Sequence, residues 1–268
     1  MADILIDQPI EGVRRITLNR PERLNAFTFD MYVEYQEALR ALKHDSSVRV
    51  VILTGAGKGF CSGHDLIGGG KPNWIDDPEM GRMYYGRHAI AEINALPILM
   101  RQLPQPIICA VNGAAAGAGF ALALASDLCI AASSAKFVNS IHNAGTGHEL
   151  GMSYMLPRAV GTQRAAEILF TARPVLAGEA ERIGLVLRTV PDEALLDTAL
   201  ELAKSIIANV PMGIWLTKQS LWINQNVGSL EAAIELESRA VAMAQATEDA
   251  AEKRKSFLEK RPPKFTNK

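Results

Sequence analysis

The sequence predicts an α/β fold with a stacked, largely parallel sheet, followed by a helical C-terminal region. Up to Pro191, short β-branched runs alternate with helical segments, which is typical of α/β architectures. After Pro191, apolar residues recur at helical spacing. The chain has 268 residues, 48% of them hydrophobic, which is enough for a sizeable core. We expect a core region at residues 1–195 and a helical region at residues 196–268.

The strands are predicted from apolar, β-branched runs that end at polar or glycine turns. Residues 48–53, Val-Arg-Val-Val-Ile-Leu, and Ile107–Val111, Ile-Ile-Cys-Ala-Val, have the composition of buried strands. Further strands are expected at residues 14–18, 128–131 and 186–189. Together these runs supply the predicted sheet.

The helices of the core region are expected between these strands. The longest of them contains Pro97, which predicts an interruption, because proline lacks the N–H that a helix interior requires. The expected helices span residues 30–43, 80–103 and 163–170.

The helical region has amphipathic character throughout. The apolar residues of 195–207 form one continuous helical face, and further helices are expected at 213–225 and Leu230–Gln245, with breaks at Pro211 and Gly228. Apolar faces of this kind must be buried. They can pack on the chain's own core, support oligomerisation, or do both.

The composition argues against several classes of protein. A net charge of −1 and a pI of about 6.5 lack the basic surplus of a nucleic-acid-binding surface, so we expect no nucleic-acid partner. Cys61, Cys109 and Cys129 are widely spaced, which favours reduced thiols over disulfides or a metal cluster. The first residues lack the features of a secretory signal, and the apolar stretch 113–125 is too short to span a membrane. We therefore expect a cytoplasmic protein without a membrane partner.

Two strand-to-glycine turns are the most informative local features. Residues 50–54 lead into the glycine-rich segment 55–66, and Ile107–Val111 leads into 112–120, which opens a helix. Glycine permits positive φ and close approach of a ligand, and the N–H groups of a first helical turn have no partner within the helix. Two such donors that converge would form an oxyanion hole, a site that stabilises negative charge on oxygen.

Each turn also has a simpler explanation. Glycine-rich turns after strands are common and often serve only to allow tight packing of a helix. A dinucleotide-binding site is a further alternative for Gly117-Ala118-Gly119, but Leu122 occupies the third glycine position of that fingerprint.

The order of the motifs resembles the enoyl-CoA hydratase/isomerase (crotonase) family over roughly residues 4–260. The segments that carry the resemblance are 16–27 (ITLNRPERLNAF), 51–55 (VILTG), 60–66 (FCSGHDL), 106–127, 135–137 (AKF), 156–158 (LPR) and 180–186. The resemblance implies a crotonase-like spiral of ββα turns. It also implies that the C-terminal helices support a homotrimer or a dimer of trimers.

The same resemblance assigns a site for an acyl-CoA thioester. The oxyanion donors fall on the backbone N–H groups of His64 and Ala118. Tyr84 and the loop 68–78 fall in the region that shapes the acyl pocket. No metal and no cofactor are implied other than the coenzyme A of the substrate. The residues that would bind the substrate around these donors are Arg23, Leu24, Ala26, Ser62, Asp65 and Leu66.

The departures from the family pattern point to the reaction. Family hydratases carry two glutamates that position and ionise water, and here those positions are Ala121 and Ile141. Glu149 instead falls where family isomerases carry an acid, in a segment that resembles the Δ3,Δ2-enoyl-CoA isomerase branch. One carboxylate suffices for isomerisation, because it can remove the C2 proton and return it to C4.

Several alternatives remain open. Glu149 could be a solvated glutamate at a helix N-terminus, where the helix dipole favours it. His142 and His148 are other titratable candidates near it, and the His64 ring could narrow the acyl pocket, touch the thioester or pair with Asp65. At the level of function, the alternatives are a hydratase or lyase with an atypical base and a non-catalytic acyl-CoA-binding protein.

Overall fold

The large sheet of the protein is mostly parallel. The computed structural model describes residues 2–70, 80–145, 147 and 149–268. Its large sheet has the order β1-β2-β3-β5-β7-β10, and only β1 is antiparallel to its neighbour. The strands are β1 (Ile4–Asp7), β2 (Val13–Leu18), β3 (Val50–Gly55), β5 (Ile107–Val111), β7 (Leu128–Ala132) and β10 (Arg188–Val190).

A second, smaller sheet gives the chain its spiral form. Its order is β4-β6-β8-β9, and β4, β6 and β8 are parallel. The successive pairs β3–β4, β5–β6 and β7–β8 each place one strand in each sheet, which confirms the spiral that the family resemblance implies. The strands are β4 (Gly59–Cys61), β6 (Ala114–Ala116), β8 (Lys136–Val138) and β9 (Val175–Leu176).

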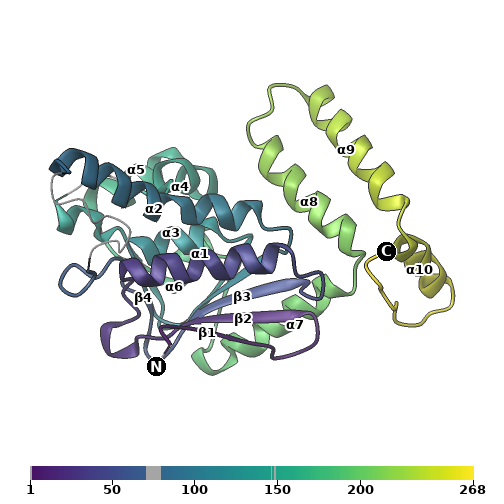
Figure 1. Cartoon of the computed structure of the whole chain (residues 1–268), viewed down its shortest axis with the longest axis horizontal. Helices are drawn as coiled ribbons and strands as arrows, with labels where there is room; N and C mark the ends of the chain where they lie inside the picture. The colour runs from purple at the N-terminus through teal and green to yellow at the C-terminus, as the bar shows by residue number, and fades with distance from the viewer. Residues whose placement is uncertain (1, 71–79, 146, 148) are drawn as a thin grey trace.

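The helices surround the two sheets and continue into the C-terminal region (Figure 1). The α/β prediction and most of the expected elements are confirmed, with ends shifted by a few residues. The helices are α1 (Phe29–Lys43), α2 (Arg82–Gln102), α3 (Ala118–Ala125), α4 (Met152–Val160), α5 (Thr162–Thr171), α6 (Ala177–Arg182), α7 (Leu195–Ile207), α8 (Pro211–Asn224), α9 (Leu230–Gln245) and α10 (Glu248–Leu258).

One local prediction was wrong, and one predicted strand is shifted along the chain. Helix α2 runs through Pro97 without a break, because Ile93, Leu96 and Met100 bury its inner face in the core, and tertiary packing overrides the proline. The strand expected at 186–189 lies later, at Arg188–Val190, because the preceding residues are held in a turn by Ala180.

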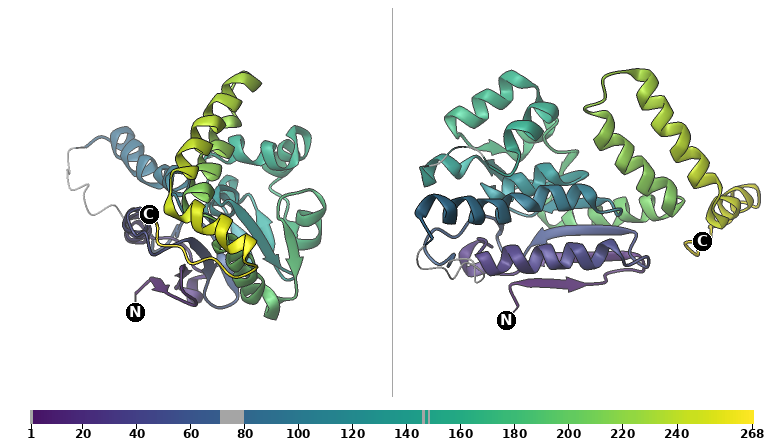
Figure 2. Two further views of the ribbon diagram at one scale, coloured as in Figure 1. Left: turned by 90° about the vertical axis from the view of Figure 1, so that its right-hand side faces the viewer. Right: turned by 45° about the horizontal axis from the view of Figure 1, so that its top comes forward.

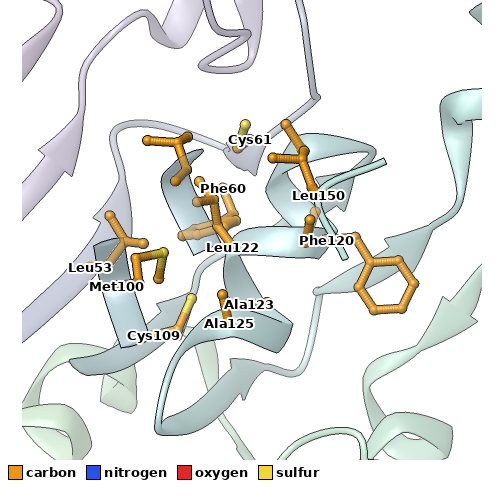
Figure 3. Packing of buried hydrophobic residues seen from close by; sticks show 14 of the residues in the cluster. Leu53, Phe60, Cys61, Met100, Cys109, Phe120, Leu122, Ala123, Ala125 and Leu150 are labelled. Carbon is orange, nitrogen blue, oxygen red and sulfur yellow. The ribbon is translucent and has the colours of Figure 1, made fainter. Parts of the chain in front are cut away.

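The core lies on both faces of the large sheet. On one face, α1, α2 and α3 pack with Phe60, Leu53 and Met100 in a continuous apolar cluster, part of which Figure 3 shows. On the other face, α7 packs Leu195, Ala199 and Ala203 on β3, β5 and β7. The first C-terminal helix is therefore buried on the chain's own core.

The last three helices form an arm that stands away from the sheets (Figures 1 and 2). Helix α8 is fixed to the body by Lys218, a buried residue whose ammonium pairs with Asp127 at 2.7 Å. Helix α9, in contrast, has no buried residue. Among the described residues no single helix is long and apolar enough to cross a membrane, and Asp192–Ile207 with Pro211–Asn224 meets the length and composition criteria only as a pair bent by 107°.

Candidate active site

The first turn of the site follows β4 and presents the amide of His64. Gly63 has a φ of +103°, a left-handed conformation that favours glycine. Its carbonyl accepts a hydrogen bond from the Phe27 N–H at 2.8 Å, and the Asp65 N–H donates to the Phe27 carbonyl at 2.9 Å. These bonds hold the residues on both sides of His64. They leave the His64 N–H with no acceptor among the described residues.

The second turn follows β6 and begins helix α3 at Ala118. Gly117 precedes the helix with a φ of +51°, and no side chain caps the first turn. The first N–H groups of a helix have no partner within it, and they lie at the positive end of the helix dipole. The Ala118 amide is therefore available to a bound group.

The two turns lie against each other. A methyl group placed on Gly63 would come within 3.2 Å of the Ala116 carbonyl oxygen and 3.6 Å of the Ala118 amide nitrogen. A methyl group placed on Gly117 would lie 3.6 Å from the Gly63 Cα atom. The amides of His64 and Ala118 thus belong to one small region, where two donors can stabilise an oxygen that gains negative charge.

The chain segment before α1 forms one side of this region. The Ser62 N–H donates to the Leu24 carbonyl at 3.0 Å, and the Ser62 hydroxyl donates to the Arg23 carbonyl at 3.2 Å. Leu24 has a left-handed φ of +49°, and its side chain is partly exposed. Arg23, Leu24 and Ser62 are therefore brought together, with the buried Ala26 close by in the chain.

Asn25 holds this segment in place, and sequence reasoning missed that function. Its fully buried amide donates to the carbonyls of Ala56, Gly59 and Phe60 at 2.9, 2.8 and 3.2 Å. Its side-chain oxygen accepts from the Arg20 N–H at 2.9 Å. A polar side chain in an irregular segment gives no periodic signal, so only the three-dimensional contacts identify it.

The Asp65 carboxylate is occupied by groups of the protein. It accepts hydrogen bonds from the N–H groups of Gly68 at 2.8 Å and Ile67 at 3.1 Å, and from the Arg20 guanidinium at 3.1 Å. The backbone bond from Gly68 is the main cause of a lowered pKa of Asp65, with Arg20 acting in the same direction. Asp65 therefore shapes the loop after His64.

The His64 ring packs against α1. Its centroid lies 5.1 Å from that of Phe29 and 5.9 Å from that of Tyr32, and the Tyr32 contact is stacked. Its Nδ1 atom is buried and has no hydrogen-bond partner in the described part of the chain. Burial lowers the pKa of His64, although Asp65 opposes the effect. The pair with Asp65 that we considered from the sequence is not formed in the described structure.

The positions of the two hydratase acids are apolar and buried. Ala121 lies in the first turns of α3, and Ile141 lies in the short helical turn Ser140–Ala144. Neither side chain can exchange a proton, so these two positions supply no acid or base.

Glu149 is the acid that the family resemblance assigns to this site. It is half-buried, and its carboxylate has no hydrogen-bond or ion-pair partner among the described residues. Burial raises the pKa of Glu149, and the same carboxylate contributes to the raised pKa of Tyr32, so the two side chains interact electrostatically. The next residue, Leu150, is held in a left-handed conformation by a bond of 2.6 Å from its N–H to Asn94 of α2.

The remaining predicted residues are more peripheral. Leu66 is 69% exposed, and Tyr84, on the first turn of α2, is 67% exposed. The Nε2 atom of His142 lies 2.9 Å from the Leu169 carbonyl oxygen. His148 and residues 71–78 of the predicted loop 68–78 lie outside the described residues.

A large cavity of the described structure does not coincide with this site. It has a volume of about 1050 Å³ and lies between the body and the arm, where Trp215, Trp222 and Arg101 line it. None of the free amides described above lines it. Within the described residues no group of three or more His, Cys, Asp or Glu side chains is arranged to hold a metal ion. The free amides and this cavity therefore lie in different parts of the molecule.

Known proteins resemble the chain over most of its length. A family model described as enoyl-CoA hydratase/isomerase matches residues 9–268. A probable enoyl-CoA hydratase from Mycobacterium bovis is 46% identical over 87% of this chain and 82% of its own. A solved probable enoyl-CoA hydratase/isomerase from Mycobacterium abscessus has a TM-score of 0.91 and 38% identity, with 100% of each chain covered. A solved monofunctional enoyl-CoA isomerase from M. smegmatis has a TM-score of 0.73 and 46% identity, with 87% of this chain and 98% of that chain covered.

Proposed function

This chain belongs to the enoyl-CoA hydratase/isomerase family, and we propose that within it the chain moves the double bond of a 3-enoyl-CoA into conjugation with the thioester, using Glu149 as the base. One observation carries this proposal. The hydratase acid positions are the buried apolar residues Ala121 and Ile141, whereas Glu149 is a half-buried carboxylate with no partner among the described residues. The 46% identity to an enzyme described as an enoyl-CoA isomerase adds support.

The proposed reaction needs one proton acceptor and two oxyanion donors. Glu149 removes a proton from C2, and the electrons of that C–H bond form an enolate whose oxygen receives hydrogen bonds from the His64 and Ala118 amides. The protonated Glu149 then returns the proton to C4, and the double bond forms between C2 and C3. Atoms and charge balance, and no oxidant or reductant takes part.

The site suits each step energetically. A preorganised oxyanion donor lowers a barrier of this kind by about 3 kcal/mol, and two backbone donors act together here. Burial raises the pKa of Glu149 above that of an ordinary glutamate, which makes it a stronger base. Because Ala118 also lies at a helix N-terminus, the dipole of α3 favours the enolate charge.

The thioester would be positioned by the segments that flank the amides. We assign contacts with coenzyme A to Arg23, Leu24, Ala26 and the segment 62–66, which lie together beside the His64 amide. We assign shaping of the acyl pocket to the region of Tyr84. This mechanism requires no cofactor beyond the coenzyme A of the substrate. A cytoplasmic location stays a prediction.

The oligomeric part of the proposal is a homotrimer or a dimer of trimers. Helix α9 buries none of its residues within the chain, although Leu230, Ile234 and Val241 are large and apolar. Contact between copies of the chain would cover this surface. The division of the chain at residue 195 also stays a prediction, since α7 packs on the sheets and the arm begins only with α8.

A spectroscopic assay separates isomerisation from hydration. A panel of 3-enoyl-CoA and 2-enoyl-CoA thioesters of different chain lengths is incubated with the protein. Isomerisation of a 3-enoyl substrate creates the absorbance of the conjugated thioester, whereas hydration of a 2-enoyl substrate removes it. We expect the first change to dominate. Faster loss of the conjugated chromophore would favour a hydratase with an atypical base, and tight binding without any turnover would favour a non-catalytic acyl-CoA-binding protein.

A further inference from the structure

Helix α1 buries two tyrosine hydroxyls that have no hydrogen-bond partner among the described residues. Tyr32 and Tyr35 are both 0% exposed, and no described group donates a hydrogen bond to either hydroxyl or accepts one from it. Buried polar groups in folded proteins are almost always paired, so an unpaired hydroxyl needs an explanation. The two tyrosines lie one turn apart on the same helix, so Tyr35 can serve as a control for Tyr32.

The two hydroxyls have different surroundings. The Tyr32 ring stacks on the ring of His64 and interacts electrostatically with Cys61 and Glu149. The electrostatic neighbour of Tyr35 is Cys109 instead. Only Tyr32 therefore combines a ring contact with the oxyanion turn and an electrostatic interaction with the proposed base.

The loop that carries Glu149 is anchored to the helix that packs on α1. One turn after Tyr32, the Gln36 amide donates to the Glu92 carboxylate of α2 at 2.7 Å. Two residues further along α2, Asn94 accepts the Leu150 N–H at 2.6 Å. Tyr32 and Glu149 are thus held by the same pair of packed helices, and each side chain lacks a hydrogen-bond partner among the described residues.

We infer that Tyr32 is a positioning residue for the proposed base, and that its hydroxyl donates a hydrogen bond to the Glu149 carboxylate when that side chain turns toward α1. The inference rests on the proposed function of Glu149. Such a bond would satisfy both unpaired groups and would orient the carboxylate. It would also favour the charged carboxylate and so oppose the effect of burial.

The other titratable groups around Tyr32 are uncharged near neutral pH and do not compete with Glu149 for its hydroxyl. Burial raises the pKa of Cys61 to about 12, so its thiol stays neutral at ordinary pH. Burial lowers the pKa of His64, so its ring is neutral near pH 7 and acquires charge only in more acidic solution. The hydroxyl of Tyr32 also stays protonated, because burial raises its pKa well above the ordinary value.

The test compares Tyr32→Phe with Tyr35→Phe by the pH profile of kcat/KM for isomerisation. Removal of the donor raises the pKa of the Glu149 carboxylate, so Tyr32→Phe should move the acid limb up by about one pH unit. At a pH below the limb, kcat/KM of Tyr32→Phe should then be about tenfold lower than that of the parent protein, with KM little changed. Tyr35→Phe removes an equally buried hydroxyl away from Glu149 and should leave the limb in place. Thermal unfolding confirms that both variants are folded.

The outcomes distinguish this inference from the proposed function. An unmoved acid limb in Tyr32→Phe would overturn the inference, and so would an equal shift in both variants, because an equal shift indicates a general effect of α1 packing. If Glu149→Gln retains full turnover, the proposed function itself fails. If Glu149→Gln is inactive while Tyr32→Phe behaves as the parent protein, only the positioning role is wrong.

Discussion

The ring of His64 stacks on the ring of Tyr32, with centroids 5.9 Å apart and planes inclined by 23°. His64 supplies one of the two free amides, and the charge of Glu149 contributes to the raised pKa of Tyr32, after burial and Cys61. The contact therefore connects the proposed oxyanion donor with the proposed base through the first turn of α1. It also explains how a bulky residue is accommodated at position 64, since its ring packs on Phe29 and Tyr32.

The pH dependence of isomerisation should report the ionisation of Glu149. The base acts only when it is deprotonated, and burial raises its pKa above the ordinary value of 4.5. Activity should therefore be full at neutral pH and fall as the pH drops through a value above 4.5. Measurement of kcat/KM from acidic to neutral pH checks this. An acid limb that persists in Glu149→Gln would assign the titration to another group.

Substitution of Gly63 by alanine should damage the oxyanion turn. Gly63 has a φ of +103°, and its new methyl group would meet the Ala116 carbonyl oxygen at 3.2 Å. We expect kcat/KM to fall about 100-fold, because a displacement of about 1 Å at a reacting centre has effects of this size. The strained backbone should lower the free energy of unfolding by about 1–3 kcal/mol.

The control for that variant is Gly178→Ala. A methyl group at Gly178, in α6, meets nothing within 4 Å, so the variant should keep its activity and its stability within about 1 kcal/mol. Equal losses in the two variants would mean that the effect of Gly63→Ala is not specific to the oxyanion turn.

Lys218→Met should loosen the attachment of α8 to the body. The Lys218 side chain is 4% exposed and pairs with Asp127 at 2.7 Å, while it also donates to the carbonyls of Met100 and Gln105. The variant leaves the Asp127 carboxylate without its cation, although the Ile107 and Trp222 N–H groups still donate to it, so the free energy of unfolding should fall by about 3 kcal/mol. Urea denaturation measures this change. Lys204→Met, which breaks an exposed pair with Glu201, should change it by less than about 1 kcal/mol.

Ile234→Glu should shift the protein toward the monomer. Ile234 shares one exposed face of α9 with Leu230 and Val241, and a charge in the middle of a buried interface is costly. Light scattering at several concentrations gives the mass of the parent protein and the variant. Ala232→Glu adds the same charge on another face of α9 and should leave the mass unchanged. A parent protein that is monomeric at high concentration would contradict the trimer.

The large sheet could be predicted because its central strands β3 and β5 are buried on both faces. The runs at 48–53 and Ile107–Val111 are almost continuously apolar, and this signal survives without any knowledge of the fold. The small sheet could not be predicted in the same way. Strands β4 and β6 have three residues each, Gly-Phe-Cys and Ala-Ala-Ala, and such segments are strands only because the spiral places them side by side. Helix α10 was missed because its sequence is strongly charged and has little apolar periodicity.

The candidate site was predictable in part for a similar reason. Glycine-rich turns after strands can be identified from spacing, and the family resemblance places the amides and the acid. The surroundings of these groups depend on long-range packing. Nothing in the sequence indicates that Asn25 bonds to three carbonyls more than thirty residues away, or that Tyr32 stacks on His64. The structure adds these neighbours, and with them an electrostatic environment for Glu149.

The most direct test of the account is the rate at which Glu149→Gln forms the conjugated chromophore from a 3-enoyl-CoA. Glutamine is close in size to glutamate but cannot accept the C2 proton. We predict that kcat falls about 1000-fold, with little change in the affinity for the thioester, because general-base catalysis accounts for a factor of this order. A variant that isomerises the substrate at the rate of the parent protein would contradict the assignment of Glu149 as the base.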